Sequence, residues 1–199
     1  DIWFPLVFGL GVYLLLSTWK RGRDLLSARL AADAMDTRSF VKGIDEVPRI
    51  PGTAVFLSPN PENVPQAMLH SLKHYKALHE RVVVLSVNVI DVPRCTDSRR
   101  VAVERLHGNF WLVKFDYGFM EQPRLPEALE WCADDGLDID PMDTSYFLGR
   151  ETLIPRFDSE MSPWRGKIFV GMFRNAGSAA GFFGLPANRV VELGTQVVL

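Results

Sequence analysis

The sequence contains few of the residues from which metal sites and covalent frameworks are built. Only two of its 199 residues are cysteines, Cys95 and Cys132, and neither has a second cysteine nearby in the sequence. Two isolated cysteines make neither a zinc site nor a disulfide framework, and they favour a reducing compartment. An excess of positive charge is also missing, because the formal net charge is −2. We therefore do not expect nucleic acid to be a partner.

Motifs for catalysis and for phosphate binding are scarce as well. Glycines stand singly in residues 51–53 and 183–186, so neither a dinucleotide-binding fingerprint nor a P-loop is present there. No combination of Ser or Cys with His and an acid indicates a nucleophilic site. His70 and His74 are four residues apart, but zinc requires further ligands, so we interpret both as exposed residues of a helix. The chain is predicted not to be an enzyme, with no catalytic residue, cofactor site or metal ligand.

What the sequence does have is an uncharged, apolar stretch at its start. Residues 2–19 carry no charged side chain, and Trp3 and Trp19 stand at the two ends. As a helix rising ~1.5 Å per residue, the stretch would span roughly 27 Å, close to the thickness of a bilayer's hydrocarbon core. Apolar residues all round the helix and aromatic residues at its ends are typical of a membrane span.

Two other interpretations of this stretch remain open. One is a buried core helix of a soluble protein. The other is a secretory signal peptide, which would carry its positive charges before the apolar run, whereas Lys20, Arg21 and Arg23 follow it here. If the stretch spans a membrane, the same cations predict that the remainder of the chain lies in the cytoplasm.

The region after the apolar stretch is predicted to be a second helix. Leu26 and Leu30 are four residues apart, with charged residues around them, which indicates an amphipathic helix on the lipid surface or against the domain that follows. A solvated linker helix is the alternative. Pro48 and Pro51 end any helix. The expected segments are the last transmembrane helix, a juxtamembrane helix and linker, and a cytosolic domain: residues 1–19, 20–48 and 49–199.

The cytosolic segment shows strand and helix patterns in alternation. The first three form a strand–helix–strand unit, whose last strand is the continuous apolar run of residues 81–90. We expect a mixed β-sheet flanked by helices, so the fold class is α/β with one N-terminal transmembrane helix. The predicted elements are strand 53–57, helix 64–78, strand 81–90, a hairpin of 99–106 and 109–117, helix 125–132, strand 144–148, helix 164–183 begun by Ser162 and Pro163, and strand 189–199.

Several long and unusual strings of residues occur in an order that identifies a family. They are WFPL at 3–6, TWKRGR at 18–23, RIPGTAVFL at 49–57, LHERVVVLSV at 78–87, YGFMEQP at 117–123, SYFLGRETL at 145–153 and FFGLPANRVVELG at 182–194. Over nearly its full length the chain thereby resembles the C-terminal region of the Kup (HAK/KT) potassium permeases. Asp1 in place of an initial Met agrees with the expectation that the sequence is a fragment.

The resemblance implies potassium uptake, driven by proton symport, through a multi-pass protein of the bacterial inner membrane. In that family about a dozen membrane helices precede the cytosolic domain, so residues 2–19 would form the last of them. The ion-binding residues of the family lie in earlier helices, and none can be assigned to this sequence.

For the cytosolic domain we predict a regulatory and assembly role. Its expected partners are membrane lipid, the rest of the permease's membrane domain and a second subunit in a homodimer. Cyclic di-AMP is a further candidate partner, because a relative of these permeases binds it, and a membrane-anchored nucleotide-binding regulatory domain is the alternative function. The candidate interface residues are Glu121, Arg150, Glu151, Arg189 and Glu192, although structural ion pairs are the commoner role of such residues and are the favoured interpretation.

Overall fold

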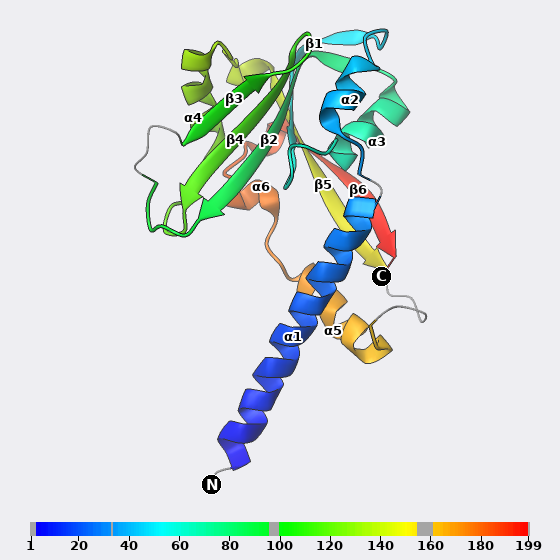
Figure 1. Cartoon of the computed structure of the whole chain (residues 1–199), viewed down its shortest axis with the longest axis vertical. Coiled ribbons are helices and arrows are strands. Elements are labelled where there is room, and N and C mark those ends of the chain that lie inside the picture. Colours follow the sequence, from blue (N-terminus) through cyan, green and yellow to red (C-terminus); the bar gives the residue numbers. More distant parts are fainter. Residues whose placement is uncertain (1–2, 33, 96–99, 155–160, 199) are drawn as a thin grey trace. The chain divides into compact units, whose positions relative to one another are not determined.

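The computed structural model describes residues 3–32, 34–95, 100–154 and 161–198. These residues form two compact units, which we describe separately. The helical unit comprises Asp1–Ala34, Glu151–Ala176 and Thr195–Leu199, and the sheet unit comprises Met35–Arg150 and Gly177–Gly194. The elements shown in Figure 1 are α1 (Trp3–Ala32), α2 (Thr37–Lys42), β1 (Arg49–Leu57), α3 (Gln66–Tyr75), β2 (Leu78–Ile90), β3 (Val101–Arg105), β4 (Phe110–Gly118), α4 (Leu125–Glu130), η1 (Trp131–Asp135), η2 (Pro141–Asp143), β5 (Thr144–Ile154), α5 (Pro163–Arg174), α6 (Ala179–Phe182), η3 (Ala187–Arg189) and β6 (Val190–Val198).

The strands form one six-stranded sheet in the order β3-β4-β2-β1-β5-β6. Strand β1 lies between β2 and β5 and is parallel to both, and β4 is parallel to β2. The edge strand β3 is antiparallel to β4, with Val101 opposite Phe115, so the sheet is mixed. The predicted α/β class is confirmed, together with the strand–helix–strand unit β1-α3-β2 and the hairpin β3-β4.

Both faces of the central strands are buried because successive side chains point to opposite faces. In β1, Val55 packs into the cluster that includes α4 and η1, whereas Ala54 and Phe56 pack into the cluster that includes α2 and α3. Figure 1 shows α2 and α3 on one side of the sheet and α4 on the other. The sheet unit therefore has three layers, helix–sheet–helix.

Three strands are longer than the sequence pattern predicts, and one of them is β2, which begins at Leu78 instead of residue 81. Strand β1 begins at Arg49, four residues before the predicted start, and β5 continues past Leu148 to Ile154. The Pro51-Gly52 break does not end β1, because the strand passes it with a shift in register between Ile50 and Thr53. Gly52 has a φ of +100° there, a backbone conformation that residues with a Cβ rarely adopt.

The predicted long helix over residues 164–183 is wrong. Helix α5 ends at Arg174, and the short α6 begins only at Ala179. The Ser178 side chain accepts a hydrogen bond from the backbone N–H of Gly181, which starts a new helix in place of continuing the old one. Ser162 does occupy the N-cap position of α5, with Pro163 following, but its side chain makes no capping hydrogen bond.

The helical unit also differs from the expected division after Trp19. Helix α1 runs without a break to Ala32, so residues 20–32 continue the first helix, and only the separate α2 follows. The side chains change from apolar to charged at Lys20, but no proline interrupts the backbone there. The helix therefore continues through Lys20.

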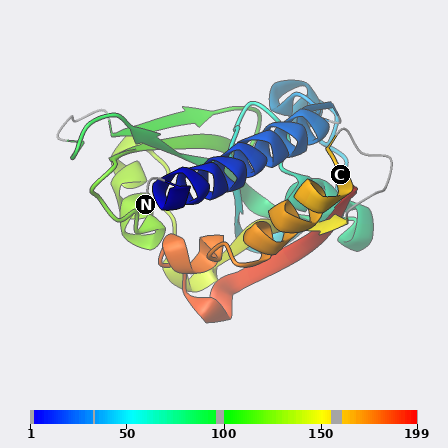
Figure 2. The same ribbon diagram turned by 90° about the horizontal axis from the view of Figure 1, so that it is seen from below.

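Helix α5 packs closely on the middle of α1 (Figures 1 and 2). On α1, Thr18, Gly22 and Leu26 are buried at intervals of four residues, which places them on one face of the helix. The ring of Phe169 in α5 lies 5.6 Å from the ring of Trp19, centroid to centroid. A Cβ atom at Gly22 would stand 2.4 Å from the Phe169 ring, so the absence of a side chain there permits the close approach.

We predict that Gly22→Ala separates α5 from α1. The added methyl group overlaps an aromatic ring held between two helices, and such overpacking lowers the free energy of unfolding by about 1–3 kcal/mol. Hydrogen exchange of the α5 backbone amides in detergent should accelerate correspondingly. Gly11→Ala is the matched control on the same helix, because nothing lies within 4 Å of a Cβ there. Equal exchange in both variants would contradict the packing described here.

Candidate functional site

The loops that follow β2 and β4 meet at one edge of the sheet. The two strands are parallel neighbours, and their last residues, Ile90 and Gly118, lie opposite each other. The carboxyl ends of parallel strands are where α/β proteins gather the loops that bind other molecules. Two backbone hydrogen bonds join the loops here, from the N–H of Phe119 to the carbonyl of Val92 (2.9 Å) and from that of Met120 to Pro93 (3.1 Å).

The carboxylate of Glu121 binds both loops at once. It accepts hydrogen bonds from the backbone N–H of Gly118 (2.7 Å) and of Cys95 (3.0 Å). The Arg100 guanidinium, next to the start of β3, donates a third hydrogen bond to it at 2.7 Å. Only 19% of the Glu121 side chain is exposed. The carboxylate therefore joins three segments that are separated in the sequence.

These contacts favour the charged form of the carboxylate. The backbone N–H groups of Cys95 and Gly118, followed by the Arg100 guanidinium, lower the pKa of Glu121 below its usual value. Burial is the largest single influence on Arg100 and acts to lower its pKa. The hydrogen bond to Glu121, the charge of Glu121 and the hydrogen bond to Cys95 together outweigh burial, and the pKa is raised. Both groups are thus ionised throughout the physiological pH range, as expected of a structural ion pair.

The buried groups near this ion pair are held in their neutral forms. Burial raises the pKa of Tyr117 to about 12, and its ring lies 5.7 Å from the guanidinium carbon of Arg100. Burial likewise raises the pKa of the Cys132 thiol to about 12. A thiol or phenol that stays protonated at neutral pH is a poor nucleophile. Neither Tyr117 nor Cys132 is therefore an activated nucleophile, and the groups around the ion pair are suited to stabilising the two loops.

The loops that Glu121 holds together expose apolar side chains to solvent. Phe119 is 60% exposed and Met120 is 67% exposed, and Val89 and Val92 beside them are exposed as well. We call these four residues the edge patch. A contiguous group of exposed apolar side chains on an ordered loop is typical of a protein interaction surface.

Gly118 is required where β4 turns into this loop. A Cβ atom there would lie 2.5 Å from the Cα of Arg94 and from the carbonyl oxygen of Pro93. Backbone atoms cannot move aside as a flexible side chain can, so the two loops approach this closely only with glycine at the position.

The other predicted site residues do not join Glu121. Arg150 and Glu192 form an ion pair with each other at 3.1 Å, between neighbouring strands β5 and β6. Glu151 belongs to the helical unit, and Arg189 ends η3. Neither Glu151 nor Arg189 forms an ion pair with another described residue. The five residues are therefore not one site, and an interface role for them stays a prediction.

Sequence reasoning missed the partners of Glu121. Arg100 is 21 residues away from it and Cys95 is 26 residues away, and only the folded sheet brings them together. The one local signal is the glycine three positions before Glu121. His70 and His74 lie on a helix as expected, α3, with their rings stacked 6.2 Å apart, but only His74 is exposed, whereas His70 is half-buried. Across the described ranges, no three His, Cys, Asp or Glu side chains are grouped as a metal site would need.

Comparison with known proteins identifies the family. The family model described as "K+ potassium transporter C-terminal domain" matches residues 51–199. This chain belongs to that family. Similar proteins include the probable potassium transport system protein Kup 3 of Dechloromonas aromatica (63% identical, covering 99% of this chain and 32% of that protein). Another is the probable potassium transport system protein Kup of Aromatoleum aromaticum, which is 54% identical over 99% of this chain and 31% of that protein. The corresponding protein of Myxococcus xanthus is 47% identical over 99% of this chain and 30% of that protein.

The chain thus spans about a third of the length of these potassium transport proteins. The family match begins at residue 51 and includes the whole Glu121 arrangement, so this arrangement belongs to the K+ transporter C-terminal domain itself. No solved structure matches the chain.

We predict that Glu121→Gln destabilises the sheet unit. The amide retains the size of the side chain but loses the charge that attracts Arg100 and strengthens the two backbone hydrogen bonds. The midpoint of thermal unfolding, followed by circular dichroism in detergent, should fall by roughly 4–8 °C. Glu127→Gln is the matched control, because the Glu127 side chain is 63% exposed and forms a surface ion pair with Arg124. A drop of the same size in the control would contradict the role given to Glu121.

The difference in stability between wild type and Glu121→Gln is predicted to depend on pH. Since the pKa of Glu121 is lowered on folding, its stabilising contribution is present above the unfolded-state pKa and is lost as the pH falls through the folded-state pKa. The difference between wild type and Glu121→Gln should therefore shrink on acidification below the ordinary pKa of a glutamate.

Proposed function

We propose that this chain is the C-terminal part of a bacterial potassium uptake permease, which takes up K⁺ together with protons, and that its sheet unit regulates and assembles the transporter. The observation that carries the proposal is the family match, together with relatives named potassium transport system proteins that are about three times as long. The chain contributes no ion-binding residue and no catalysis of its own.

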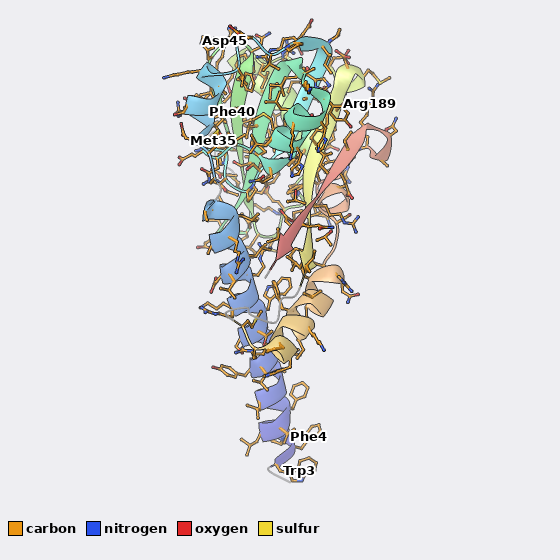
Figure 3. All side chains as sticks on the ribbon, turned by 90° about the vertical axis from the view of Figure 1, so that its right-hand side faces the viewer. Trp3, Phe4, Met35, Phe40, Asp45 and Arg189 are labelled. Carbon is orange, nitrogen blue, oxygen red and sulfur yellow. The ribbon has the colours of Figure 1, made fainter. Side chains whose placement is uncertain are left out.

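We further propose that the start of α1 spans the bacterial inner membrane, with residues 1–19 as the last transmembrane helix. By length and composition, α1 is the one described helix that could cross a membrane. Its apolar side chains are exposed from Trp3 to Leu16, whereas a core helix of a soluble protein would bury them. Figure 3 shows Trp3 and Phe4 projecting from the free end of the helix.

The cations after this stretch support a cytoplasmic location for residues 20–48 and 49–199. Lys20, Arg21 and Arg23 follow the apolar part directly, and basic residues at one end of a span favour the cytoplasmic side. The burial of Leu26 against α5 supports packing within the protein for the juxtamembrane segment, over the alternative of a solvated linker.

Removal of residues 49–199 from the full-length permease is predicted to lower Rb⁺ uptake by about fivefold or more, the effect of losing a coupling free energy of about 1 kcal/mol. The measurement is uptake by a strain deficient in its own potassium uptake systems. Insertion into the membrane, measured on the same cells by fractionation, should be unaffected. Wild-type uptake by the truncated protein would refute the regulatory role.

The edge patch is the part of the sheet unit that we propose contacts the membrane domain of the same permease. Its apolar side chains are exposed in this chain, and roughly two thirds of the length of the relatives lies outside it. The Glu121 carboxylate sits directly behind the patch and fixes the loop that carries it. A preorganised apolar loop loses little conformational entropy on docking.

Replacing both Phe119 and Met120 by Ser should weaken this docking while leaving the sheet unit folded, because both side chains are exposed. We expect Rb⁺ uptake to fall by about fivefold, as in the truncated protein. Met142→Ser is the matched control, since Met142 is 74% exposed on η2. Uptake lowered equally by the control, or by neither variant, would show that the edge patch does not dock.

A membrane-anchored nucleotide-binding domain is the alternative function. The order of the parallel strands favours it, because β2 and β5 flank β1 and create the kind of crevice in which doubly wound sheets bind nucleotides. The loop after β1 argues against it. Residues 58–65, which connect β1 to α3, contain no glycine, so the close backbone approach of a phosphate-binding turn is not built there. We therefore place this alternative second.

A further inference from the structure

Helix α5 meets α1 at the point where the apolar stretch of α1 ends. The guanidinium of Arg165 donates hydrogen bonds to the hydroxyl of Thr18 (2.9 Å) and to that of Ser17 (2.8 Å). The first charged residue of α1, Lys20, lies just beyond these two hydroxyls. If the preceding stretch lies in hydrocarbon, Arg165 is therefore at the depth of the lipid headgroups.

The outward face of α5 has the composition of an interfacial helix. Phe169 and Val170 are buried in the helical unit, whereas Trp164, Lys167 and Arg174 are exposed. The exposed positions are separated by three and seven residues, so they form a single stripe along the helix. Trp164, at the end of α5 nearest the apolar part of α1, is 52% exposed. Trp and basic side chains on one face are typical of helices that lie at a membrane surface.

Positive charge dominates the two packed helices. Helix α1 contains four basic residues and α5 contains three, against one acidic residue, Asp24. Arg165 and Lys167 form no ion pair with any carboxylate among the described residues. Two of the five N–H groups of Arg165 are used by the hydroxyls of α1, which leaves three to donate to another acceptor.

We propose that α5 is an interfacial helix that binds anionic phospholipid headgroups, with Lys167 on the outward face directed at the phosphates, Trp164 in the headgroup layer, and the remaining N–H groups of Arg165 donating to a phosphate at the boundary with α1. The proposal rests on the proposed function in one respect, since it requires α1 to span the bilayer. The charge of the surface is complementary to an acidic lipid, and the surface continues directly from the apolar part of α1. Basic residues next to a membrane attract anionic lipid.

Fluorescence quenching by brominated lipid tests the proposal on the full chain in vesicles. Two vesicle preparations contain the same phosphatidylglycerol and phosphatidylcholine, with bromine near the headgroup end of the chains of only one lipid. In one preparation phosphatidylglycerol is brominated, and in the other an equal amount of phosphatidylcholine is brominated. The part of the quenching that disappears in Trp164→Phe belongs to Trp164, and the part that disappears in Trp3→Phe belongs to Trp3.

We expect both tryptophans to be quenched, with Trp164 quenched about twofold more by brominated phosphatidylglycerol than by brominated phosphatidylcholine. Lys167→Gln should bring this ratio close to one, because an exposed charge is removed without loss of packing. Lys73→Gln, which removes an exposed charge on α3, should leave the ratio unchanged. Arg165→Lys retains the charge and should retain the preference.

The outcomes separate this proposal from the proposed membrane span. Quenching of Trp3 without quenching of Trp164, or equal quenching of Trp164 by both lipids, would overturn the interfacial lipid site and leave the span intact. If neither tryptophan is quenched, α1 does not enter the bilayer, and both proposals fail.

Discussion

The parallel strands β1, β2 and β4 and the first part of β5 carry apolar side chains on both faces, and neither face can be left to water. In β1 alone, Ala54, Val55 and Phe56 are completely buried. Helices must therefore cover both sides, and the chain supplies α2 and α3 for one and α4 for the other. With both faces covered, these central strands are accessible only at their ends. The loops at the carboxyl ends are therefore one place where the central strands can present side chains to a partner.

Those loops need an internal support, because an exposed apolar loop without one would fold back onto the core or fluctuate. Glu121 provides the support with one carboxylate and three donors, and burial of the carboxylate strengthens each contact. The charge of Glu121, within the YGFMEQP string, is thus accounted for by the contacts that hold the loops together. The neighbouring Phe119 and Met120 are the side chains that this loop leaves exposed.

Secondary structure that depends on neighbouring residues could be predicted from the sequence. Contacts between residues far apart in the sequence could not. The apolar run of β2 and the turn at Gly108, which has a φ of +62°, predicted the central strand and the hairpin. The end of α5 was missed although Gly177 weakens a helix at this point, and the cap at Ser178 then starts a separate helix. Motif residues pointed to Glu121, but nothing local indicated Arg100, since their pairing depends on how β3 returns along β4.

The close packing of α1 and α5 was equally invisible in the sequence, since Gly22 resembles any glycine until Phe169 is placed against it. Yet this contact determines what the helical unit can do. Alone, α1 has an apolar first half and a basic second half. With α5 held at the boundary between these halves by Gly22 and by the hydroxyls of Ser17 and Thr18, the unit gains a second basic helix beside the first. The two helices therefore act as one packed body, since polar contacts at one end of their shared face and a glycine in its middle both keep α5 in place.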